Sequence, residues 1–110
     1  MLVRCKKEVF DVEVCRSVFS KLRGLMFRKR LKKDGLLFVF KKEAKVSLHM
    51  LFVLFPIDVV YLNRDKKVVE IKRNVKPFSL YVLGPPAQYI LELKDAKAVK
   101  VGERFSITLK

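Results

Sequence analysis

The chain has 110 residues, of which 51% are hydrophobic and 33% charged. This composition suits a single compact domain over residues 1–110, with a real core, and it excludes intrinsic disorder. The formal net charge of +14 attracts polyanions such as nucleic acid. Many lysines together with few Asn and Gln are also typical of a thermophile surface, and we favour this second interpretation.

Alternating apolar and polar residues predict that the amino-terminal part forms a hairpin of Met1–Cys5 and Val9–Cys15. The helical spacing of apolar residues then predicts one short helix over Arg16–Arg23, which Gly24 can end. Further short strands are expected between turn residues, at Leu36–Phe40, Val46–Val53, Ile57–Leu62, Val68–Arg73, Leu80–Leu83, Gln88–Lys94, Val99–Val101 and Phe105–Leu109. The pattern predicts a mostly β fold: a small antiparallel β-sandwich or barrel with one short α-helix packed on it.

The two cysteines, Cys5 and Cys15, stand alone in the sequence without a CxxC pair. With one histidine in the chain they cannot complete a zinc set, so we expect neither a metal nor a cofactor. A bridge across the predicted hairpin is conceivable, but buried thiols in a reducing compartment are the favoured interpretation. The chain has no signal peptide pattern and no apolar run long enough to cross a membrane, so we expect a cytoplasmic protein, monomeric or weakly associating.

Asp58 is the most unusual residue of the apolar run Leu48–Leu62, because it shares a strand face with Val60 and Leu62. A carboxylate in such a place needs hydrogen-bond donors or a cation. It either braces a neighbouring loop, through backbone N–H groups or an arginine such as Arg28, or serves as a ligand-binding or catalytic acid in a cleft. We favour the structural role. Glu92, by contrast, falls on an alternating polar position and needs no special role.

His49, in the same run, is the only histidine. A lone histidine among apolar residues is usually a half-buried side chain with its hydrogen bonds satisfied. If it met Asp58 across paired strands, the pair could do general acid–base chemistry. No phosphate-binding loop or hydrolase motif accompanies it, so an enzyme is the less favoured expectation.

A basic loop follows the expected helix, and cations of this kind can neutralise phosphates. Its strongest candidates for binding a nucleic-acid backbone are Lys29, Arg30, Lys32 and Lys33. Specific binders usually interleave aromatic residues with such cations, whereas only Phe27 lies within this cluster. A solvated loop is therefore the favoured interpretation.

Several pieces in a characteristic order resemble domain of unknown function family 192, also called uncharacterised protein family UPF0127, in its archaeal branch. They are Gly24-Leu25-Met26-Phe27-Arg28, Leu31, Gly35-Leu36-Leu37-Phe38-Val39-Phe40, His49-Met50, Pro56-Ile57-Asp58-Val59-Val60-Tyr61-Leu62 and Tyr89-Ile90-Leu91-Glu92-Leu93. The resemblance implies a small, mostly antiparallel jelly-roll with one short helix. It implies no established activity, cofactor or ligand.

The family's recurrent positions map onto Gly24-Leu25-Met26, Met50 and Asp58. This chain has His49 where the family often has Trp, and Leu51-Phe52 where it often has Lys-Asn. Together these observations favour a non-enzymatic binding module for an unknown ligand. Its expected site residues are His49, Met50, Asp58 and Arg28.

Overall fold

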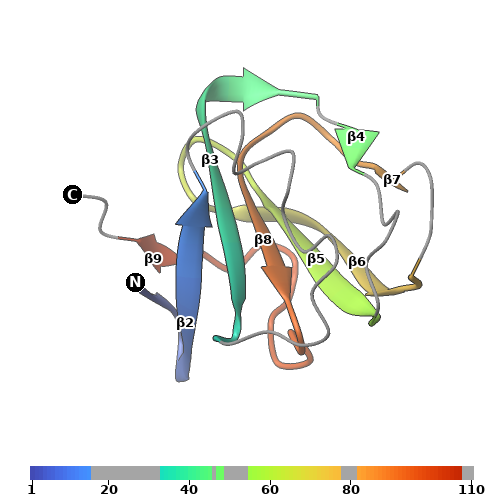
Figure 1. The fold of residues 1–110 in the computed structure, drawn as a ribbon. Coiled ribbons are helices and arrows are strands. Elements are labelled where there is room, and N and C mark those ends of the chain that lie inside the picture. The colour runs from blue at the N-terminus through green and yellow to red at the C-terminus, as the bar shows by residue number, and fades with distance from the viewer. Residues whose placement is uncertain (16–32, 46, 49–54, 78–81, 108–110) are drawn as a thin grey trace.

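The computed structural model describes residues 1–15, 33–45, 47–48, 55–77 and 82–107, and the regular secondary structure within these ranges is all β (Figure 1). In chain order the strands are β1 (Leu2–Cys5), β2 (Glu8–Cys15), β3 (Gly35–Ala44), β4 (Ser47–Leu48), β5 (Ile57–Leu62), β6 (Val68–Val75), β7 (Val82–Leu83), β8 (Ala87–Leu93) and β9 (Ser106–Ile107). The predicted mostly β class is confirmed. The predicted helix over Arg16–Arg23 lies outside the described residues.

Seven of these strands form one curled sheet in the order β6-β5-β8-β3-β2-β1-β9, and β4 pairs with β7 separately. The predicted antiparallel sandwich or barrel differs from the structure in two ways: seven of the described strands lie in one curled sheet, and β2 and β3 run parallel within it. The long connection over residues 16–34 allows the chain to return to the same end of the sheet before β3 starts. Alternation of apolar residues looks the same in parallel and antiparallel strands, so the sequence pattern could not reveal this direction.

The sheet curls so strongly that the chain just before β6, at one edge, contacts the chain just before β9, at the other. Lys67, just before β6, forms an antiparallel bridge with Arg104, just before β9. The backbone N–H of Val68 donates to the carbonyl of Glu103 at 2.8 Å, and that of Phe105 donates to the carbonyl of Lys66 at 2.9 Å. We call this junction of residues 66–68 with residues 102–105, together with the adjoining pairing of β1 with β9, the seam. Because the seam joins the two edge regions of the sheet, the curl is nearly closed.

Several predicted strands are confirmed, but β3 continues four residues beyond its predicted end at Phe40, to Ala44. Of the predicted strand Val46–Val53, only Ser47–Leu48 is a described strand, and residues 46 and 49–53 lie outside the described residues. The β1–β2 hairpin pairs Val3 with Phe10, and β5 has the predicted bounds. The predicted strand at Val99–Val101 is wrong, because this segment forms turns in which the Val99 N–H donates to the Ala96 carbonyl at 2.9 Å. Val99 is apolar because it fills the core from a loop, which mimics a strand signal.

Two apolar clusters cover the two faces of the sheet. The larger includes residues from both edge regions of the sheet, so it lies on the inner face of the curl; its members include Val3, Val12, Leu37, Val60, Leu62, Val68, Leu91, Leu93, Val99 and Phe105. The smaller lies on the outer face and consists of Cys15, Leu36, Phe38, Ile57, Val59, Tyr61, Ala87 and Ile90. The central strands are thus buried on both sides. In the described ranges, no helix is both long and apolar enough to cross a membrane.

Candidate functional site

Asp58 sits on the inner face of β5, as its alternation with Val60 predicts, and both of its carboxylate oxygens accept backbone N–H groups. Oδ1 accepts from Asn74 at 2.8 Å and Oδ2 from Ala96 at 2.7 Å. Asn74 lies in a register shift between β5 and β6, where it has a positive φ of 51°. The carboxylate therefore ties β5 to an irregular part of β6 and to the turn after β8.

Arg73 binds two carbonyl groups of the same turn. Its Nη1 donates to the Ala96 carbonyl at 2.8 Å and its Nη2 to the Val99 carbonyl at 2.6 Å. Charge-assisted bonds of this kind are stronger than neutral ones. Ala96 and Val99, both fully buried, are thereby pinned under the inner core. These contacts match the loop-bracing role of Asp58, with backbone donors in place of an arginine partner.

Most other site residues expected from the sequence lie outside the described ranges. They are Arg28, Lys29, Arg30, Lys32, His49 and Met50. Lys33 is described and exposed, with its Nζ 3.5 Å from Asp11 Oδ1. Asp58 and Lys33 thus have different partners, which are backbone N–H groups for Asp58 and the Asp11 carboxylate for Lys33.

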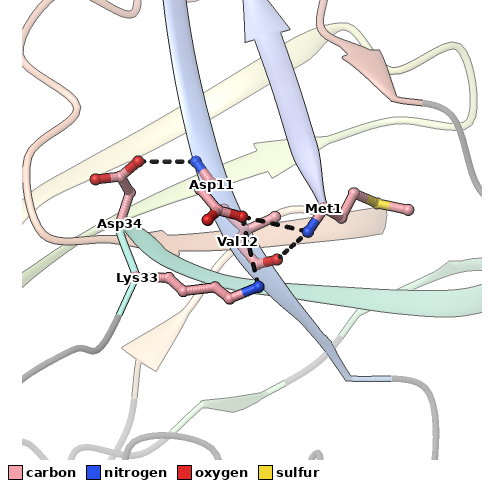
Figure 2. Close-up of polar contacts among 5 residues, drawn as sticks. All are labelled: Met1, Asp11, Val12, Lys33 and Asp34. Atoms are coloured by element: carbon pink, nitrogen blue, oxygen red, sulfur yellow. Dashed lines mark hydrogen bonds and ion pairs between the residues drawn. The ribbon is translucent and has the colours of Figure 1, made fainter.

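Asp11 is the centre of a polar cluster at the end where β2 meets β3 (Figure 2). Its Oδ1 receives the Met1 ammonium at 3.3 Å, and its backbone N–H donates to Asp34 Oδ2 at 2.7 Å. The hydrogen bond from the Met1 ammonium, together with Lys33, holds the pKa of Asp11 below its usual value. Because the Met1 ammonium and Lys33 neutralise the Asp11 carboxylate, we interpret this cluster as a link between strand ends and not as a ligand site.

Glu92 is the functional candidate that sequence reasoning missed. It lies in the middle of β8, is only 6% exposed, and shares the outer face with Ile90. Burial raises the pKa of its carboxyl to about 7. No hydrogen bond between described residues reaches this carboxyl. The signal that could have identified Glu92 is the apolar character of the strands on either side of β8. Because β8 lies between β3 and β5, whose residues are buried on both faces, the Glu92 side chain is covered even though its position alternates with apolar residues.

Tyr61 lies on the same outer face and is fully buried. Its hydroxyl has no hydrogen-bond partner in the described part of the chain. Burial, with smaller effects from Glu70 and Glu92, raises the pKa of this phenol to about 12. The ring lies directly against Gly84, where a Cβ atom would collide with it. A side chain so tightly enclosed yet lacking a polar partner calls for an explanation.

The strand register places these groups together. Ile90 opposes Tyr61 and Glu92 opposes Val59, so Glu92 and Tyr61 are diagonal neighbours on adjacent strands, about 7–8 Å apart in the backbone. Glu70 opposes Tyr61 from β6 and pairs with Lys72, Nζ to Oε2, at 3.1 Å. We call these four side chains, Tyr61, Glu70, Lys72 and Glu92, the outer-face polar group.

The cysteines do not form a site. Cys5 opposes Glu8 at the turn end of the hairpin, whereas Cys15 lies at the far end of β2, so the two thiols cannot reach each other. Both are buried thiols, as predicted. Across the described ranges, no three His, Cys, Asp or Glu side chains gather closely enough to hold a metal ion.

A sequence profile of an uncharacterised family, DUF192 (Uncharacterized ACR, COG1430), matches residues 1–107. The chain belongs to the DUF192 family. This confirms the resemblance found in the sequence, including its archaeal branch. A UPF0127 protein of Pyrococcus furiosus is 37% identical over 105 residues, covering 89% of this chain and 88% of the relative. One of Thermococcus kodakarensis is 37% identical over 83 residues, which cover 74% of this chain and 52% of that protein.

Two crystal structures of other proteins have the same fold. A protein of unknown function from Novosphingobium aromaticivorans has a TM-score of 0.83 at 25% identity, covering 91% of this chain and 76% of its own. A proposed transcription regulator from Sinorhizobium meliloti has a TM-score of 0.84 at 26% identity, covering 96% and 91%. The curled sheet is therefore shared between archaeal and bacterial sequences.

Proposed function

We propose that this DUF192 protein is a small, non-enzymatic binding domain whose ligand contacts the outer-face polar group. The observation that carries the proposal is the Tyr61 hydroxyl, which is fully buried without a described hydrogen-bond partner. Leaving such a group unsatisfied costs about 1–3 kcal/mol. Stability alone would favour phenylalanine at this position, so a bound molecule that satisfies the hydroxyl gives the tyrosine a purpose.

Glu92 supports the same proposal from the neighbouring strand. A carboxyl whose pKa is near 7 exists in both forms at neutral pH. It can accept a hydrogen bond from a ligand N–H when ionised and donate one when protonated. An apolar residue would serve a purely structural role in β8 better. Together the phenol and the carboxyl suit a small polar molecule with amine, amide or hydroxyl groups.

The residues predicted from the sequence enter this proposal differently. His49, Met50 and Arg28 stay candidates for the ligand site. Asp58 contributes less, because both of its oxygens already accept backbone N–H groups. It lies on the inner face, opposite to Glu92 and Tyr61. We assign it to the frame of the sheet that positions the site.

The test is thermal unfolding of the purified protein with amino acids, nucleosides and monosaccharides as probes. A probe at about one hundred times its Kd stabilises the native state by about 2.7 kcal/mol, which raises Tm by roughly 10 °C in a domain of this size. We expect at least one class to do so, and Tyr61→Phe or Glu92→Gln to abolish the shift. The matched control Tyr89→Phe, on the inner face, should keep it. If no probe raises Tm, or the variants respond like wild type, the proposal is wrong.

A second candidate function is contact with nucleic-acid backbones. The net charge of +14 favours it, and the related Sinorhizobium structure is described as a proposed transcription regulator. Fluorescence anisotropy of a labelled 20-base-pair DNA duplex at 50 mM salt tests it. Binding that weakens steeply as salt rises supports this function. Absence of any binding at 50 mM salt rules it out.

A further inference from the structure

The seam carries three exposed cations on its outward side. Arg104 opposes Lys67 across the bridge that joins the two edges of the sheet, and Arg4 opposes Ser106 in the pairing of β1 with β9. Phe105 and Ile107 are buried while Arg104 and Ser106 are exposed, so the latter two point outward from the same extended segment. Residues far apart in the sequence are thereby brought onto one surface strip.

The strip has regular dimensions because it is built on paired backbone. Neighbouring strands lie about 4.8 Å apart and alternate residues on one strand lie about 7 Å apart. From Arg4 to Lys67 the strip therefore spans about 12 Å of backbone, with Arg104 between them. Duplex DNA carries one phosphate charge per ~1.7 Å of axis, so about seven charges pass along such a length.

Among the described residues, no ion pair involves Arg4, Lys67 or Arg104. Glu103, the acid beside them in sequence, is already engaged: its Oε2 pairs with Lys6 at 2.9 Å. Its Oε1 accepts the Lys100 N–H at 2.8 Å. Three like charges held together by the closure of the sheet leave a local positive field that an external anion would neutralise.

We propose that the outward side of the seam binds the phosphate backbone of duplex nucleic acid through Arg4, Lys67 and Arg104, with Ser106 as an additional donor. This proposal rests on the second candidate function and assigns it a surface distinct from the basic loop predicted from the sequence. The only aromatic residue of the segment, Phe105, is buried in the inner core, so no ring is available to stack on unpaired bases. The strip therefore reads charge and not sequence.

The test compares two triple variants by fluorescence anisotropy on the 20-base-pair duplex between 50 and 200 mM salt. R4Q/K67Q/R104Q removes the seam charges. The control K41Q/K42Q/K45Q removes the same number of exposed charges from β3 and the residue after it. Each lost phosphate contact lowers the slope of log K against log salt by about one, so the seam variant should lose about three. Its affinity at 50 mM salt should fall at least tenfold, while the control stays within about twofold of wild type.

Three other outcomes overturn the seam proposal. If both variants lose affinity equally, DNA responds to the overall charge and the second candidate function survives without this surface. If wild type does not bind DNA at all, both ideas fail together. A parallel experiment measures binding of the same proteins to phosphatidylglycerol vesicles. If wild type binds vesicles but not DNA, and the seam variant loses vesicle binding, the strip contacts a membrane surface instead.

Discussion

Asp58 Oδ2 accepts the backbone N–H of Ala96 at 2.7 Å, so one side chain of β5 fixes a turn that lies 38 residues further along the chain. Arg73 completes the attachment by binding the carbonyl of the same residue. The two contacts satisfy both backbone polar groups of Ala96, whose side chain is fully buried. The carboxylate in an apolar strand is thereby explained by the backbone it organises.

Replacing Asp58 with Asn tests this role. The amide retains one acceptor oxygen and turns its NH2 group toward a backbone donor, so one N–H loses its partner. We expect the free energy of unfolding in urea at pH 7 to fall by about 2 kcal/mol. Asp95→Asn is the control, because Asp95 is exposed and caps only the Lys97 N–H locally; it should change stability by less than about 0.5 kcal/mol. Equal stability of Asp58→Asn and wild type would refute the bracing role.

Glu92 predicts a pH dependence of stability. Its folded pKa is about 7 against an ordinary value of 4.5, so the native state holds a proton that the unfolded chain releases between these values. Stability therefore falls as pH rises from 4.5 to 7, by roughly 3 kcal/mol from this group. Glu92→Gln lacks the titration, so its unfolding free energy relative to wild type should rise by that amount between pH 4.5 and 8. A difference in unfolding free energy that stays constant between pH 4.5 and 8 would contradict this prediction.

The contact between Gly84 and Tyr61 predicts a strong coupling. A methyl group at position 84 would collide with the Tyr61 ring, so Gly84→Ala should destabilise the protein by about 1–3 kcal/mol. Tyr61→Leu removes the colliding ring and makes room for that methyl group. In a double-mutant cycle measured by urea unfolding, we expect Gly84→Ala to cost at least 1 kcal/mol less in the Tyr61→Leu protein than in wild type. Additive effects would show that the ring and the glycine do not constrain each other.

Cys5 should react slowly with alkylating reagents. Burial, followed by the nearby Glu103 carboxylate, raises the pKa of its thiol to about 11. At pH 8 the reactive thiolate is then about a hundred times scarcer than in an unperturbed thiol of pKa 9. In a Cys15→Ala background, iodoacetamide should label native Cys5 at least a hundredfold more slowly than the urea-unfolded chain. Comparable rates in the two states would contradict the enclosed, protonated thiol.

Much of the fold could be predicted because alternation survives in most strands. Ile57–Leu62 has the bounds and faces that its apolar periodicity indicates, and the strands of the first hairpin begin within one residue of their predicted starts. Asp58 was identified because a charge among apolar neighbours violates that periodicity. The parallel pairing of β2 with β3 could not be predicted, since side-chain alternation contains no information about strand direction.

The candidate site was harder to predict, and Glu92 and Asp58 show why. A polar residue at an alternating position normally faces solvent, so Glu92 looked ordinary until its strand was placed between two others with both faces covered. For Asp58 the sequence left a bracing role and a site role open and favoured bracing, but it could not identify the donors at residues 74 and 96, whose proximity depends on a register shift and a turn. Neither environment is a property of the local sequence.

By itself the sequence determined the β class, the family and the strands that must be buried, because these follow from local periodicity and from the order of short motifs. Only the tertiary structure decided which carboxylate is enclosed, which one is bound to backbone and which cations share a surface. Burial and charge proximity depend on contacts between residues distant in the chain. The curl that brings Lys67 to Arg104, 37 residues apart in the chain, is one example of such contacts.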